Sequence, residues 1–262
     1  MAKYKKVKIE PLTEIEKLNL KKGSEKHYDA TDLPAEKQKE LLSKLMDIAR
    51  QSEGAIVAKP VSGKQYVAAT VRTTKQKGKT FAFPEPNPIH AYYKIAIQHL
   101  EQAETFQTQF HDAVNGHPEQ EYETFCNFFE EIVQGIVFLL MTVEGFINQL
   151  PNEDQVYQIN GNERTKSDIE WMNVTDKLRL ALPALTGNNI FVTNKPMYDH
   201  LQLLNDLRND LIHLKKLELA NFTYYQGLFK RLLDFPSGDI ANAVFDFINI
   251  INPNFLVEEN QP

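Results

Sequence analysis

Arginine, asparagine and histidine stand close together in one segment of the chain, at Arg208, Asn209 and His213. Arginine offers a planar fork of donors that suits phosphate oxygens. Histidine is the side chain that takes or gives a proton most readily near neutral pH, and an amide can orient an imidazole ring or a hydroxyl group. Together the three side chains suit metal-free cleavage of RNA, in which the 2′-hydroxyl already lies next to the scissile phosphate.

The segment around this trio has the spacing of an amphipathic helix over about 196–216. Turning 100° per residue from Leu207 places Asn209 and His213 at about 200° and 240°, and Arg208 at about 100°. The leucines fall within about 60° of the origin and form one apolar stripe. Its members are Leu204, Leu207, Leu211 and Leu214. The pattern predicts a helix that buries the stripe and displays the trio.

The order Arg-Asn-x-x-x-His, late in a helical region, resembles the signature of the HEPN superfamily, the higher-eukaryote and prokaryote nucleotide-binding group. The three residues match that signature position by position. The apolar stretch 142–150 and the stretch 176–187 also resemble parts of such domains. The resemblance covers roughly 90–216 and does not extend to residues 1–88.

The resemblance implies an all-α HEPN-like bundle that acts as a metal-independent endoribonuclease and needs no cofactor. The motif helices of two subunits meet in such families, which implies a homodimer through the 196–216 helix. His213 is then the general acid or base, Arg208 holds the phosphate, and Asn209 positions the 2′-hydroxyl or the imidazole. The products are a 2′,3′-cyclic phosphate and a 5′-hydroxyl. The implied setting is a toxin or an antiviral-defence effector, with an antitoxin or a sensor protein as a partner.

The alternative is a non-catalytic HEPN-like interaction module, because similar domains also act as binding partners. The trio would then bind a nucleotide or a protein, or would be an ordinary exposed face of a helix. What discriminates the two functions is whether two copies of His213 can approach one phosphate.

Glu144 is a further candidate for the catalytic site, because it is a carboxylate within an apolar stretch. Such a carboxylate needs a partner. One interpretation is that Glu144 fixes Arg208 or His213 from a neighbouring helix. The other is that it pairs with Lys177, Arg179 or water.

Charge is unevenly distributed along the chain. Residues 1–88 carry 18 Lys and Arg against 11 Asp and Glu, and the other residues carry 11 against 24, which gives the net charge of −6. A basic arm can meet RNA, or it can lie on the acidic part of its own chain or of a sister subunit. If it meets RNA, the predicted contacts are Arg72, Lys75, Lys77 and Lys79.

Three prolines within residues 84–88 mark the main boundary, because proline ends regular elements. Residues 1–88 are predicted to form a basic extension with a helix over 34–51 and a β-hairpin over about 55–83. Residues 89–262 are predicted to form the helical bundle. Its expected helices span about 90–114, 118–150, 167–184, 194–216, 221–233 and 238–251.

Composition excludes several classes of protein. The 262 residues are 42% hydrophobic and 24% charged, which is typical of a globular chain. The single cysteine, Cys126, excludes a disulfide framework and a CxxC zinc or redox motif. The apolar run Ile132–Val143 is shorter than the roughly 20 residues of a membrane span, and the charged N-terminus lacks a leader pattern. We therefore expect a cytoplasmic protein with no membrane contact and no metal.

Overall fold

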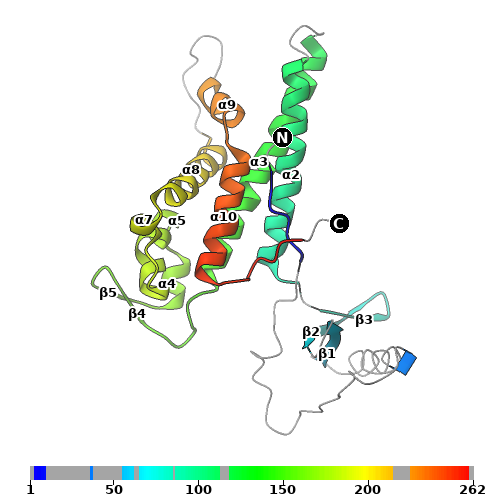
Figure 1. Ribbon diagram of the computed structural model, residues 1–262, viewed down its shortest axis with the longest axis vertical. Coiled ribbons are helices and arrows are strands. Elements are labelled where there is room, and N and C mark those ends of the chain that lie inside the picture. Colours follow the sequence, from blue (N-terminus) through cyan, green and yellow to red (C-terminus); the bar gives the residue numbers. More distant parts are fainter. Residues whose placement is uncertain are drawn as a thin grey trace. The chain divides into compact units, whose positions relative to one another are not determined.

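The computed structural model describes residues 3–9, 36–37, 55–61, 65–84, 86–112, 118–214 and 225–259. The chain forms two compact units (Figure 1). One unit comprises Met1–Lys8 and Ile89–Pro262, and the other comprises Ile9–Pro88. The division falls next to the proline-rich segment. The first eight residues belong with the helical unit, whereas the sequence analysis grouped them with the extension.

The helical unit holds the helices from α2 onward, and the part of the chain that the structure describes is mostly helical, as expected of the all-α class. Its long helices are α2 (Pro88–Asp112), α3 (Pro118–Asn148), α8 (Lys195–Ile212) and α10 (Ser237–Ile251). Its short elements are α4 (Lys166–Glu170), α5 (Val174–Asp176), the π-helical turn η2 (Lys177–Ala181), α6 (Leu182–Thr186), α7 (Ile190–Thr193) and α9 (Gln226–Leu233).

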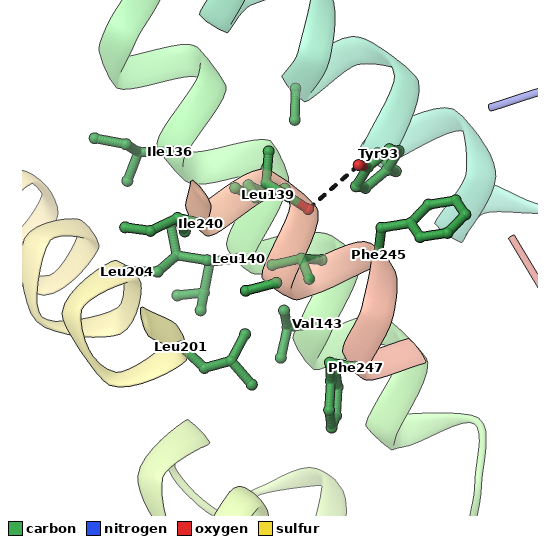
Figure 2. Packing of buried hydrophobic residues seen from close by; sticks show 14 of the residues in the cluster. Tyr93, Ile136, Leu139, Leu140, Val143, Leu201, Leu204, Ile240, Phe245 and Phe247 are labelled. Carbon is green, nitrogen blue, oxygen red and sulfur yellow. Dashed lines mark hydrogen bonds between the residues drawn. The ribbon is translucent and has the colours of Figure 1, made fainter. Parts of the chain in front are cut away.

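The core lies where α3, α8 and α10 meet (Figure 2). Apolar residues recur on most sides of α3, so this helix buries side chains against several neighbours at once. Burying each such side chain contributes about 1.5–3 kcal/mol. The buried residues labelled in Figure 2 are Tyr93 of α2, Ile136, Leu139, Leu140 and Val143 of α3, Leu201 and Leu204 of α8, and Ile240, Phe245 and Phe247 of α10.

Two glycines let α2 approach α3 closely. A Cβ atom added to Gly135 would lie 2.5 Å from Cδ2 of Leu100, and one added to Gly145 would lie 2.8 Å from Cδ1 of Ile89. A side chain at Gly135 would therefore require the Leu100 side chain to shift, and one at Gly145 would require the end of the Ile89 side chain to move. These contacts fix how α2 packs along α3.

Between Gln120 and Asn148, α3 is long and apolar enough to cross a membrane by length and composition alone. The apolar stretch is therefore longer than the run from Ile132 to Val143. However, residues throughout this stretch, such as Phe128 and Phe146, are buried in the core. A core helix of a soluble protein passes the same test, so this helix is weak evidence for a membrane span.

Residues 3–8 run along the helical unit and pair with the C-terminal segment. Val7 forms a β-bridge with Glu258, and the tyrosine hydroxyl of Tyr4 donates to Glu104 at 2.6 Å. Two lysines of the segment make ion pairs with the helices. These are Lys5 with Asp246 and Lys6 with Glu101. For these residues, the interpretation that the basic arm lies on the acidic part of its own chain is therefore confirmed.

The other unit contains a three-stranded antiparallel sheet rather than the predicted two-stranded hairpin. Lys77 and Gly78 have φ of 49° and 76° and form a two-residue turn that adds the third strand. The predicted helix over 34–51 lies outside the described residues except for 36–37. The strands, in the order β1-β2-β3, are Ala55–Val61, Gln65–Gln76 and Lys79–Pro84.

Residues 151–187 differ most from the prediction. A small hairpin, β4 (Tyr157–Ile159) with β5 (Asn162–Arg164), occupies the expected loop. A capping box begins at Thr165, whose hydroxyl accepts from the backbone N–H of Asp168. The single helix predicted over 167–184 is instead broken into α4, α5, η2 and α6. Gly187 ends the last of them with φ of 73°, as expected of a left-handed C-cap.

Candidate functional site

Helix α8 carries the Arg-Asn-x-x-x-His trio and is fixed at both ends. Asn194 caps its first turn by accepting from the backbone N–H of Met197 at 3.3 Å. Its last helical residue is Ile212, four residues before the predicted end. The backbone N–H of His213 still donates to the carbonyl of Asn209 at 2.9 Å, so His213 stands directly at the C-terminus of the helix.

The predicted leucine stripe is buried except at its last member. Leu204, Leu207 and Leu211 are buried in the core. Leu214 is 52% exposed, because the helix has already ended and the chain no longer follows the helical turn. The stripe anchors α8, whereas Arg208 and Asn209 are half-buried and His213, which follows the last helical residue, is exposed.

Arg208 and Asn209 lie together at a cavity of about 310 Å³. The guanidinium of Arg208 donates to the side-chain oxygen of Asn209 at 3.1 Å. Both side chains are half-buried, so they are held in place and still reach solvent. The described residues lining the cavity are Glu144, Asn173, Val174, Thr175, Asn205, Asp206, Arg208 and Asn209.

His213 does not line this cavity. It is exposed and stands one helical turn beyond Asn209. The structure thus brings Arg208, Asn209 and Glu144 to one cavity and places the histidine at the end of the same helix. The apolar side chains on either side of it are also exposed, Ile212 by 50% and Leu214 by 52%.

Glu144 pairs with Lys177, which is one of the two interpretations drawn from the sequence. The ammonium nitrogen of Lys177 lies 2.9 Å from a carboxylate oxygen of Glu144. Among the described contacts, Glu144 has no hydrogen bond to Arg208 or His213. The prediction that Glu144 fixes one of these residues directly is therefore not supported, because the buried lysine takes that place.

Lys177 is completely buried, which is rare for a lysine and requires partners for its charge. It has two: Glu144 and the backbone carbonyl of Glu170, at 2.8 Å. The side chain of Glu144 is 33% exposed and faces the cavity lined by Arg208. Lys177 therefore fixes the carboxylate of Glu144 at the wall of the cavity. From the sequence it was predicted only as one possible partner of Glu144.

Local signals in the sequence explain how Lys177 reaches this position. The side chain of Asn173 accepts from the backbone N–H of Asp176 at 2.8 Å and starts α5. The chain then widens into the π-helical turn Lys177–Ala181, which turns Lys177 towards the interior. Such π-turns are frequent at functional sites.

A chain of polar contacts fixes the wall between α5 and α8. Asn205 is buried and donates to the hydroxyl of Thr175 at 3.4 Å. That hydroxyl donates to Gln202 at 3.2 Å, and Gln202 donates to Asp206 at 2.8 Å. Networks in which each buried group has a partner favour one rigid arrangement. These contacts hold α5 and α8 together at this wall of the cavity.

The four predicted RNA contacts lie in the sheet unit. The register pairs Gln76 with Lys79 across the turn and places Lys75 one pair further from it. Lys77 is exposed in the turn itself. Arg72 lies three residues before Lys75 on β2. Three of the four predicted contacts therefore stand at one end of the β2–β3 hairpin.

Among the residues that the structure describes, no group of three or more His, Cys, Asp or Glu side chains could hold a metal ion. The chain matches no family model, no curated protein and no solved structure. The resemblance to the HEPN superfamily therefore rests on the Arg208-Asn209-x-x-x-His213 motif and on the helix that carries it.

Proposed function

We propose that this chain is a metal-independent endoribonuclease of HEPN type that cleaves RNA by attack of the 2′-hydroxyl. One observation carries the proposal: α8 brings Arg208 and Asn209 together at a cavity and ends next to an exposed His213. A guanidinium and an amide next to an imidazole supply the phosphate binding and the proton transfer that cleavage of a phosphodiester uses.

In the proposed reaction, His213 accepts the proton of the 2′-hydroxyl while the 2′-oxygen attacks the phosphorus. The bond from phosphorus to the 5′-oxygen breaks, and a second histidine gives this oxygen a proton. Arg208 binds the non-bridging oxygens and stabilises the growing negative charge. Asn209 orients the guanidinium through its 3.1 Å hydrogen bond. Arg72, Lys75, Lys77 and Lys79 supply further phosphate contacts.

A second histidine would come from a homodimer built around the C-terminal end of α8. Ile212 and Leu214 support this, because both are exposed on either side of His213. Apolar side chains exposed next to a site are typical of a surface that a partner covers. The setting we propose is a toxin or an antiviral-defence effector in the cytoplasm, controlled by an antitoxin or a sensor protein.

Cleavage should not need a divalent metal ion. The purified protein, incubated with a single-stranded RNA and excess EDTA, should give fragments that end in a 2′,3′-cyclic phosphate and a 5′-hydroxyl. Resistance of the 3′ ends to phosphatase, and labelling of the 5′ ends by a kinase without prior phosphatase, identify these groups. Loss of cleavage in EDTA with recovery in Mg²⁺ would refute the mechanism.

The protein should be a dimer at micromolar concentration by light scattering. Replacing both Ile212 and Leu214 with Asp should give a monomer and lower the rate of cleavage, because the charges cannot be buried in the interface. Val192→Asp on α7 is the matched control, since Val192 is exposed and apolar but distant in sequence from the motif. A wild-type monomer with full activity would contradict the shared site.

The position of His213 favours one alternative, a nucleotide-binding interaction module. Arg208 and Asn209 line the cavity and His213 does not, so the cavity can hold a nucleotide without cleaving it. The two functions differ in one measurement. A module binds RNA or nucleotides and leaves the RNA intact at any protein concentration.

A further inference from the structure

We propose that the cavity beside α8 is a base-recognition subsite that selects guanine, with Glu144 as the residue that determines specificity and Lys177 as the residue that positions it. The inference deepens the proposed function, because it names the nucleotide next to the cleaved phosphate. It depends on the contacts of Glu144 and on the lining of the cavity, and His213 takes no part in it.

The chemistry of Glu144 sets the kind of base edge that fits. An ionised carboxylate only accepts hydrogen bonds, and its two oxygens offer about four lone-pair sites. Lys177 contacts one oxygen, at 2.9 Å, so further sites remain for a ligand. Because the ammonium of Lys177 is completely buried, it fixes the carboxylate at the cavity wall.

Guanine is the base whose edge matches this acceptor best. It presents two adjacent donors, N1–H and the N2 amino group, which one carboxylate can accept side by side. Adenine and cytosine each offer one amino donor next to an acceptor nitrogen, and uracil offers one N–H between two carbonyls. A carboxylate next to an acceptor is left with an unsatisfied or repulsive contact, which disfavours binding of these three bases.

The remaining lining suits the rest of a nucleotide. Arg208 is the cation of the lining and Asn205 contributes an amide, whereas both ends of the Asn173 amide are bonded to Asp176. A volume of about 310 Å³ lies at the lower end of the range for small-ligand sites, roughly 300–1,000 Å³. The cavity therefore fits one nucleoside, with its phosphate directed to Arg208.

Trp171 does not line the cavity, but it stands close in the sequence to Asn173, which does. It is 87% exposed, stands two residues before Asn173, and directly follows Glu170, whose carbonyl is bound by Lys177. Exposed aromatic rings stack on unpaired bases in RNA-binding proteins. Trp171 is also the single tryptophan of the chain, so its fluorescence reports on ligands near this wall.

The test is a fluorescence titration of the full-length His213→Ala variant, which prevents turnover, with 3′-GMP, 3′-AMP, 3′-UMP and 3′-CMP in turn. We expect 3′-GMP to quench the fluorescence of Trp171 with a Kd about tenfold or more below the Kd values of the other three nucleotides. Glu144→Gln should raise the Kd for 3′-GMP about tenfold and change the others little, since an amide offers one acceptor in place of two. Glu130→Gln, an exposed position on the same helix, is the matched control.

Equal affinity for all four nucleotides would overturn the proposal, as would unchanged guanine preference in Glu144→Gln. The ranking of the four nucleotides needs no change at Glu144, so it tests the proposal even if that variant folds poorly. The Lys177→Met variant should also raise the Kd for 3′-GMP, because the carboxylate of Glu144 loses the ammonium that holds it.

The guanine can belong to RNA or to a free nucleotide, and mapping of the cut sites on a mixed-sequence RNA separates these sources. Cuts next to guanines assign the cavity to the substrate. Cuts without base preference, at a rate that 5′-GTP alters, assign it to a free guanine nucleotide. Guanine-selective binding without any cleavage by the wild type would refute the ribonuclease and leave the subsite standing. Cleavage with neither base preference nor a response to 5′-GTP would refute the subsite alone.

Discussion

His213→Ala should remove cleavage of RNA and leave the fold unchanged. A general acid or base contributes roughly 10²–10⁴-fold to the rate of such a reaction, and in a dimer both histidines of the shared site would be lost together. The side chain is exposed at the end of α8, and substitutions at exposed sites change stability by about 0.5 kcal/mol or less. Initial rates on a labelled RNA and the thermal unfolding curve measure the two effects.

His111→Ala is the matched control for this experiment. His111 is also an exposed histidine in the last turn of a helix, α2, but it lies outside the motif. Its variant should cleave RNA at the parental rate. If His213→Ala instead aggregates or loses several kcal/mol of stability while Arg208→Ala retains activity, the histidine serves the fold and the ribonuclease assignment fails.

Periodicity predicted the elements that carry the site. The apolar rhythm around Leu204 and Leu207 required a helix with one buried side, and α8 has it. The proline-rich boundary and the apolar α3 were likewise evident in the residues alone. Such patterns are informative because burial of a long stripe outweighs local preferences.

Short-range chemistry explains where the prediction was wrong. Asn160 and Gly161 have positive φ and form the turn between β4 and β5. An Asn-Gly dipeptide is a signal for a hairpin, and the prediction for this segment did not include it. Thr165 and Asn173 both cap helices, so the expected single helix had two starts. The turn Lys77-Gly78 has a lysine at its first position, where Asn, Asp or Gly is usual. The third strand was not predicted for that reason.

The cavity could not be predicted from spacing. Glu144 and Lys177 are 33 residues apart, and a buried lysine has no periodic signature. What places it is the π-helical turn after α5, which shifts the register of the chain by one residue relative to an α-helix. The sequence left two interpretations of Glu144, and pairing with Lys177 was one of them. The packing of α3 against the segments that follow it brings these two residues together.

Glu144→Leu should destabilise the helical unit far more than removal of both charges. The single change leaves the ammonium of Lys177, which is 0% exposed, with only the carbonyl of Glu170 as a described partner. Removing one partner of a buried ion pair costs roughly 3–5 kcal/mol, whereas replacing both partners with apolar residues is often neutral. Because Glu144 is itself one third exposed, we expect a loss at the lower end of that range.

The double variant Glu144→Leu with Lys177→Met should recover most of this loss, since no charge is then left in the core. Urea unfolding followed by the helical circular-dichroism signal gives the free energies of the three proteins. Asp199→Ala, which breaks the exposed pair with Lys195 on α8, is the control and should cost less than about 1 kcal/mol. Equal destabilisation in the single and double variants would show that packing at these positions, and not the buried charge of Lys177, holds the wall of the cavity.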